Sequence, residues 1–263
     1  GSEMCIRDRS LLEQLDQNHE LSSKDKSIID RCTGDLYKNY KRGGPLPTLL
    51  SLRELLLVQP EPEARDLALS MELFTEGSLN AFAYPTNVNT NNRIVVYDIL
   101  DLGEQLKTMG LLVITDAILN RVTENWKHGR RTHVYLDEFH VVYDNPYSSM
   151  FFNSAWRRFR KRNAFPTGIT QNVEYLLDNS AARSILSNSE FVVMHNQAAS
   201  DREKLAELFN ISEDQMKYIT NAEAGHGLMK IGNALVPFVN RFPKNTELYR
   251  NMTTKPGETE MWG

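Results

Sequence analysis

Two adjacent carboxylates follow a short apolar segment near the middle of the chain. Residues 133–136 are typical of a buried strand, and Asp137 and Glu138 come directly after them. In α/β proteins, ligands bind at the carboxyl ends of parallel strands. An aspartate at that place can hold the water shell of Mg²⁺, and a glutamate can orient and polarise an attacking water. The alternative is a solvated acidic turn at a strand end.

An amide side chain closes the next predicted strand. Gly168, Ile169, Thr170 and Gln171 follow one strand–helix–strand crossover after Glu138. Such crossovers are right-handed almost without exception, so Gln171 is expected at the same sheet edge as Glu138. A neutral amide there can donate to a γ-phosphate oxygen and accept from the attacking water. A helix cap is the alternative role for the Thr-Gln pair.

A run of cations lies between these two elements, over residues 157–162. Phosphoryl transfer needs an arginine against the charge that develops on the phosphate, in cis or from a neighbouring subunit. Arg160 is the first candidate for this role and Arg157 the second. The alternatives are a solvated helix end, which the helix macrodipole favours, and a contact with DNA.

The elements that must position these residues alternate between strand and helix after about residue 93. Residues 10–80 are expected to form an all-α segment, with helices from Ser22 to Gly43, 48–58 and 61–74. Strands are expected at 93–99, 132–136, 165–170 and 191–195, with helices between them and a hairpin over 227–238. This order predicts an α/β fold with a mostly parallel sheet flanked by helices.

Composition sets limits on the class of protein. The 263 residues carry 30 basic and 34 acidic side chains, for a net charge of −4. This balance argues against general coating of nucleic acid, so direct nucleic-acid binding is expected to be weak. No apolar run of the length of a membrane-spanning helix is present. Two cysteines are too few for a disulfide framework.

Several motifs together resemble a known family. The strings 134–140, 160–164 and 168–172 are similar to the ATPase of type IV secretion and conjugation systems, the fourth component of the VirB machinery. That family belongs to the HerA/FtsK branch of RecA-like motors. The similarity extends from about residue 20 to the end of the chain.

The resemblance implies ATP and Mg²⁺ as cofactors, with Glu138, Gln171 and Arg160 catalytic. Asp137, Glu138, Gln171 and Arg157 would contact the nucleotide, and Asp137 would hold Mg²⁺ through water. It also implies a homo-oligomer that contacts other secretion subunits at the cytoplasmic face of the bacterial cell membrane. A DNA translocase or coupling protein, and a docking module without catalysis, are the alternative functions.

The resemblance also implies an organisation along the chain. Residues 10–80 would be the family's all-α insertion, 81–244 the carboxyl-terminal part of the RecA-like core and 245–263 a loosely ordered tail. Residues 1–9 resemble a tag scar followed by translated adaptor sequence, so we expect the native protein to begin elsewhere.

One expected motif is missing. The phosphate-binding loop of such motors, Gly-x-x-x-x-Gly-Lys-Ser/Thr, should precede the acidic strand end. The sequence contains no Gly-Lys pair, and Lys41-Arg42-Gly43-Gly44 has the wrong order. The backbone amides and the lysine of that loop bind the β- and γ-phosphates. We therefore expect this chain to hold no nucleotide and to lack ATPase activity.

Overall fold

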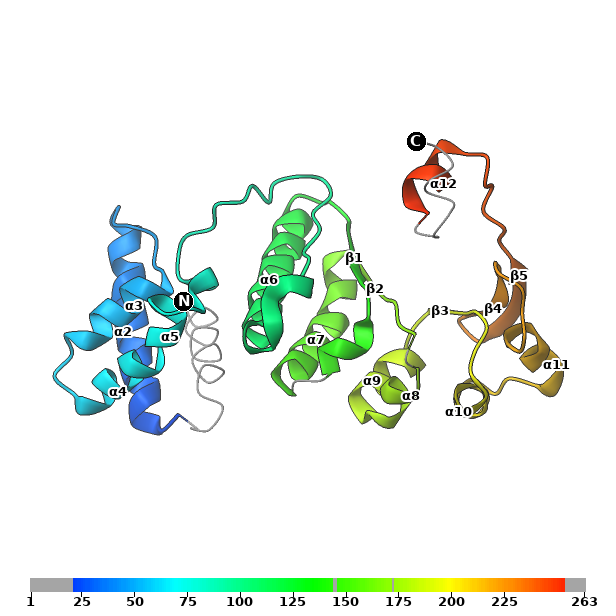
Figure 1. Ribbon diagram of the computed structural model, residues 1–263, viewed down its shortest axis with the longest axis horizontal. Coiled ribbons are helices and arrows are strands. Elements are labelled where there is room, and N and C mark those ends of the chain that lie inside the picture. The colour runs from blue at the N-terminus through cyan, green and yellow to red at the C-terminus, as the bar shows by residue number, and fades with distance from the viewer. Residues whose placement is uncertain (1–20, 144–145, 172, 254–263) are drawn as a thin grey trace. The chain divides into compact units, whose positions relative to one another are not determined.

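The computed structural model describes residues 21–143, 146–171 and 173–253. The chain forms two compact units, residues 1–120 and residues 121–263, which are described separately (Figure 1). The long helix α6 (Gly103–Lys127) begins in the first unit and ends in the second. No helix among the described residues is both long and apolar enough to cross a membrane.

The first unit is helical, as the sequence predicts. It contains α2 (Ser23–Lys41), α3 (Leu49–Leu57), α4 (Pro62–Ser70) and α5 (Glu72–Thr75). Capping boxes begin α2 at Ser22 and α3 at Thr48, because each cap side chain accepts the backbone N–H three residues later. Apolar side chains from α2, α3 and α4 form its core, which includes Ile29, Cys32, Leu56, Ala64 and Ala68.

One predicted strand is absent from this unit. Residues 93–99 lie between the short 3₁₀ helices η1 (Asn80–Phe82) and η2 (Leu100–Leu102), form no regular secondary structure and pair with no strand. Ile94 is 80% exposed and Val96 is 84% exposed, so this segment is not buried. The strand predicted there is therefore wrong for this structure. β-Branched composition favours a strand only where neighbouring strands supply pairing and burial.

The second unit contains the elements that carry the predicted site. Strands β1 (Thr132–Leu136) and β2 (Ala164–Gly168) pair in parallel, with Leu136 opposite Gly168. The crossover between them consists of η3 (Phe139–Tyr143), α7 (Pro146–Phe159) and η4 (Arg160–Arg162). Buried aromatic side chains of η3 and α7, among them Phe139, Tyr143 and Phe152, pack with Leu176 and Ala182.

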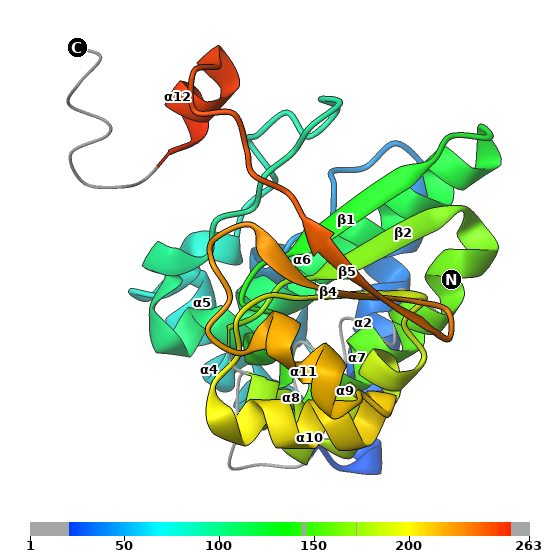
Figure 2. The ribbon, with the colours of Figure 1, turned by 90° about the vertical axis from the view of Figure 1, so that its right-hand side faces the viewer.

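A second sheet follows β2. The chain passes through α8 (Val173–Asp178) and α9 (Ser180–Ser187) to β3 (Phe191–Met194), then through α10 (Ala199–Phe209), α11 (Glu213–Met216) and η5 (Lys217–Ile219). The hairpin of β4 (His226–Ile231) and β5 (Ala234–Val239) adds to β3 in the antiparallel order β3-β4-β5. Figure 2 shows both sheets and the helices α8 to α11 beside them.

The α/β class is confirmed, with a parallel sheet of β1 and β2 and covering helices, but the strand predicted at 191–195 belongs to a separate antiparallel sheet with the hairpin. The helix expected over 173–187 divides at Asn179, because this side chain accepts the N–H groups of Ala181 and Ala182 and starts α9. Within the predicted carboxyl-terminal tail, α12 (Glu247–Met252) forms from a cap at Thr246. The domain limits at residues 80 and 244 remain predictions. The predicted leader at 1–9 lies outside the described residues.

Candidate functional site

The carboxyl ends of β1 and β2 are joined by two backbone hydrogen bonds beyond the strands. Ile169 N–H donates to the Leu136 carbonyl at 2.8 Å, and Phe139 N–H donates to the Ile169 carbonyl at 2.8 Å. The residues after β1 therefore lie beside the residues after β2. This places Asp137, Glu138 and Gln171 at one sheet edge, as the crossover argument predicts.

The chain turns sharply at Glu138, which has a φ of 46°. A left-handed conformation costs a non-glycine residue about 1–2 kcal/mol, so the surroundings must stabilise it. Asp137 contributes to this, because its Oδ1 accepts the Glu138 N–H at 3.0 Å. Strained backbone of this kind is found disproportionately at functional sites.

Both oxygens of the Glu138 carboxylate have a neighbouring group. Gln171 Nε2 donates to Oε1 at 3.3 Å, and His140 Nδ1 lies 3.4 Å from Oε2. The same His140 nitrogen lies 3.2 Å from Thr170 Oγ1. The glutamate side chain is still 47% exposed, so it remains open to a water or a ligand.

Gly168 allows this edge to form. A Cβ added there would lie 2.8 Å from both Cγ and Cδ1 of Phe139, closer than real Cβ contacts come. The phenyl ring of Phe139 is buried against the end of β2. A glycine at the last position of β2 therefore lets the residue after Glu138 pack closely.

An open cleft of about 630 Å³ lies next to Glu138. Its walls come from the end of β1, η3, α8 and the start of α10. They are formed by polar and acidic side chains with two small apolar ones: Glu138, His140, Val141, Gln171, Glu174, Ala198, Ser200 and Asp201. The cleft suits a polar ligand that brings its own positive charge, such as a metal-bound anion.

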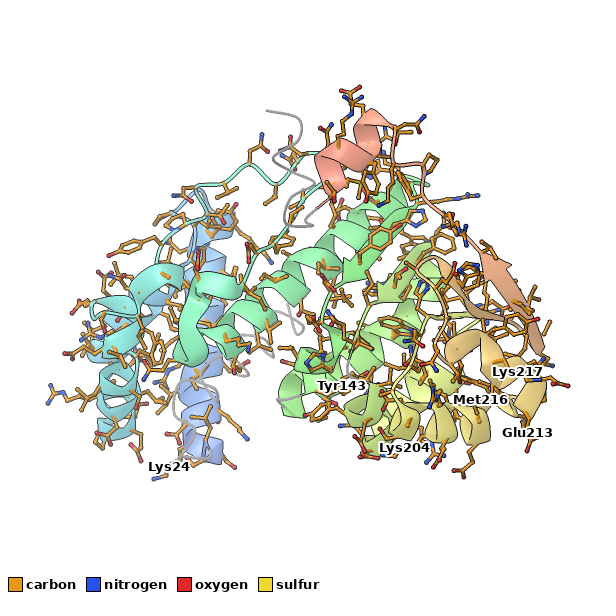
Figure 3. All side chains as sticks on the ribbon, turned by 45° about the vertical axis from the view of Figure 1, so that its right-hand side comes forward. Lys24, Tyr143, Lys204, Glu213, Met216 and Lys217 are labelled. Atoms are coloured by element: carbon orange, nitrogen blue, oxygen red, sulfur yellow. The ribbon has the colours of Figure 1, made fainter. Side chains whose placement is uncertain are left out.

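Asp201 is a cleft residue that the sequence did not single out. It is 7% exposed, and its Oδ1 has no hydrogen-bond partner among the described residues. Burial, followed by the nearby charge of Glu174, raises the pKa of the Asp201 carboxyl, and Lys204 opposes the shift. Lys204, labelled in Figure 3, bonds Glu174 at 3.1 Å and Asp178 at 2.9 Å. In sequence, Asp201 resembles any acidic residue in a first helical turn.

The two candidate arginines lie away from this cleft. Arg160 precedes the first residue of β2, while Gln171 follows its last. A strand of five residues spans about 16 Å at about 3.3 Å per residue. Arg157 lines a separate groove of about 410 Å³ between α7 and α9. The structure therefore brings Asp137, Glu138 and Gln171 together but not Arg157 or Arg160.

The described residues could hold Mg²⁺ only through water molecules. They contain no group of three His, Cys, Asp or Glu side chains that could hold a metal ion. Asp137 is exposed and uses one carboxylate oxygen for the Glu138 N–H, which leaves the other oxygen for a water of the metal. The remaining ligands would have to be water and phosphate oxygens, which Mg²⁺ accepts readily.

The sequence matches no known protein-family model and no curated protein. Among solved structures, the chain is similar to VirB4 of Thermoanaerobacter pseudethanolicus, with a TM-score of 0.73 and 22% identity. The match covers 92% of this chain and 70% of that one. The chain therefore has the fold of VirB4, which agrees with the family that the sequence motifs resemble.

Proposed function

We propose that this chain is part of an ATP-hydrolysing motor of type IV secretion, and that Asp137, Glu138 and Gln171 form its hydrolytic edge. The observation that supports this best is the hydrogen bond between Gln171 and Glu138 at the ends of adjacent parallel strands. The VirB4 fold and the family motifs in the sequence support the same assignment. The motor would act at the cytoplasmic face of the membrane, as an oligomer with other secretion subunits.

Each residue of the edge has a role in this proposal. Glu138 accepts a proton from the attacking water and orients it toward the phosphate. Gln171 holds the Glu138 carboxylate through one oxygen and can turn its amide toward the γ-phosphate. Asp137 holds the metal through water, and Mg²⁺ when bound would neutralise charge on the β- and γ-phosphates.

The proposed site needs two further groups that this edge does not supply, a phosphate-binding loop and an arginine. A phosphate-binding loop is absent from the sequence, so this chain alone is expected to bind Mg-ATP very weakly and to show no ATPase activity. Arg160 would reach the phosphate of a neighbouring subunit, because it lies at the opposite end of β2 from its own Glu138. Arg157 would support that contact.

Calorimetry and turnover assays test the proposal. This chain should show no micromolar affinity for Mg-ATP, whereas a longer chain with an upstream phosphate-binding loop should bind and hydrolyse it. In the longer chain, Glu138→Gln should keep nucleotide binding and lower turnover by roughly 10² or more, because the water loses its polarising carboxylate. Glu174→Gln is the matched control, since Glu174 lines the same cleft but lies farther along the chain, on α8. Equal turnover in Glu138→Gln and the parent would refute the assignment.

A further inference from the structure

The outer face of the β1–β2 sheet carries a row of exposed rings. His133 and Tyr135 lie on β1 and Phe165 lies opposite His133 on β2. The rings of His133 and Phe165 stack with centroids 5.1 Å apart, and those of His133 and Tyr135 are 6.5 Å apart. Tyr135 is 68% exposed and Phe165 is 45% exposed.

The opposite face of the same two strands is buried. Val134 and Ala164 point into the unit and are 7% and 3% exposed. Side chains alternate between the two faces of a strand, so the outer surface of this part of the sheet consists of the ring row and the exposed Thr167, which lies opposite Tyr135. Stacked rings across two strands stabilise a sheet, but that effect does not require them to remain open to solvent.

Cations gather at the amino ends of the same strands. Arg130 and Arg131 precede β1, and Lys161 precedes β2. The Thr132 N–H donates to the Asn163 carbonyl at 3.2 Å, which holds these two approaches side by side. The three cations are exposed, and none has an ion-pair partner in the part of the chain that the structure describes. The net charge of −4 therefore conceals a local basic edge.

We propose that this ring row and the adjoining basic edge bind single-stranded nucleic acid. Bases of any sequence can stack on exposed aromatic rings, and cations beside the rings can neutralise the phosphates that connect those bases. A duplex would fit poorly, because its bases are already stacked on one another. Two of the three rings, those of His133 and Tyr135, also carry polar atoms, which distinguishes this face from an aliphatic surface that another protein would cover.

Fluorescence anisotropy with a fluorescein-labelled oligothymidylate tests the proposal on the chain as it is. Affinity should fall as salt rises, with a slope of log K against log salt of about −2 for three phosphate contacts at about −0.7 each. The double variant Tyr135→Ala/Phe165→Ala should bind on the order of tenfold or more weakly with an unchanged slope, because it removes stacking and no charge.

The basic edge makes a separate prediction in the same assay. Arg131→Ala/Lys161→Ala should reduce the magnitude of the salt slope by about 1.4, two contacts at about 0.7 each. Tyr218→Ala/Arg183→Ala is the matched control, since it removes one exposed aromatic and one exposed cation from other surfaces of the same unit. This control should bind as the parent does.

This proposal does not depend on ATP hydrolysis, so the binding assay tests it independently of the proposed function. It is overturned if the parent shows no salt-dependent binding, or if the aromatic double variant binds as well as the parent. It is also overturned if the double variant changes the sedimentation coefficient and leaves oligonucleotide binding unaltered, which would assign the face to self-association. Tyr135→Leu/Phe165→Leu, which keeps apolar packing but removes the rings, separates lost stacking from lost folding.

Discussion

The two ends of the β1–β2 sheet differ in charge and in how tightly their side chains are held. At the carboxyl end, Asp137 accepts the Glu138 N–H, and Glu138, at the acidic cleft, accepts a hydrogen bond from Gln171. At the amino end, Arg160 and Lys161 are exposed and have no ion-pair partner among the described residues. The same two short strands thus separate an ordered acidic edge from an open basic edge.

This separation limits how the two edges can work together. A strand of about 16 Å keeps Arg160 away from the Glu138 of its own chain. In the proposed function, the Arg160 guanidinium would approach a phosphate at the Glu138 edge of another copy, not at that of its own chain. This separation is the reason why our proposal gives Arg160 a role in trans, one of the two possibilities that the sequence leaves open.

The largest expected effect comes from removing Arg160 in an active, longer chain that carries a phosphate-binding loop. Arg160→Ala should lower ATP turnover by around 10³, the low end of the range for an arginine that stabilises phosphoryl transfer. Arg158→Ala is the control, because Arg158 is an exposed neighbour on α7. Steady-state ATPase assays give the comparison.

Mixing two inactive variants tells whether the two edges meet between copies. Glu138→Gln subunits keep an intact Arg160, and Arg160→Ala subunits keep an intact Glu138. If Arg160 acts in trans, the mixture should regain part of the activity, because some interfaces pair an intact site with an intact arginine. A mixture that stays inactive would contradict the head-to-tail arrangement.

Gly168→Ala should destabilise the acidic edge by about 1–3 kcal/mol. The added methyl group would collide at 2.8 Å with the ring of Phe139, which is buried and cannot move freely, although Gly168 itself is exposed. The shift would also displace Glu138, the residue before Phe139. Urea unfolding of the present chain measures the change in the free energy of unfolding.

A glycine at the basic edge provides the matched comparison. Gly129, between α6 and β1, has a φ of 67° and no atom within 4 Å of an added Cβ. Gly129→Ala should cost about 1 kcal/mol through the backbone alone. Gly129→Asn should cost less, because asparagine tolerates the left-handed region, whereas Gly168→Asn should cost at least as much as Gly168→Ala. If alanine and asparagine changed the free energy of unfolding in the same way at Gly129 as at Gly168, packing would not be what distinguishes the two edges.

The sequence predicted the acidic edge because its evidence is local and topological. A strand end with Asp137-Glu138, followed by one crossover to Gln171, specifies which side chains meet. Exposure depends on tertiary neighbours, so residues 93–99 were wrongly predicted as a buried strand. The separation of Arg160 from Glu138 depends on which end of β2 each residue occupies, and Asp201 reaches the cleft only through the packing of α10. Neither leaves a periodic signal in the sequence.

The smallest expected effect concerns Asp201, a buried residue that lines the acidic cleft. Burial and the charge of Glu174 raise its pKa in the folded state above the unfolded value. The folded state then holds the proton more tightly, so the stability linked to that proton is complete below the unfolded pKa and is lost as pH rises through the folded pKa. At pH 7 the ionised carboxylate therefore opposes folding.

Asp201→Asn should remove this charge and keep an oxygen that can accept the Glu174 N–H, the backbone group that now bonds the carboxylate. We expect it to raise the free energy of unfolding at pH 7 by up to about 1 kcal/mol, and the gain should shrink as pH falls toward the unfolded pKa. Asp214→Asn is the control, because Asp214 is 91% exposed and only pairs with Lys217. Urea unfolding at several pH values measures both variants. A loss of stability in Asp201→Asn at pH 7 that disappears as pH falls would contradict this prediction, because it would mean that the fold uses the ionised carboxylate as a partner for the Lys204 charge.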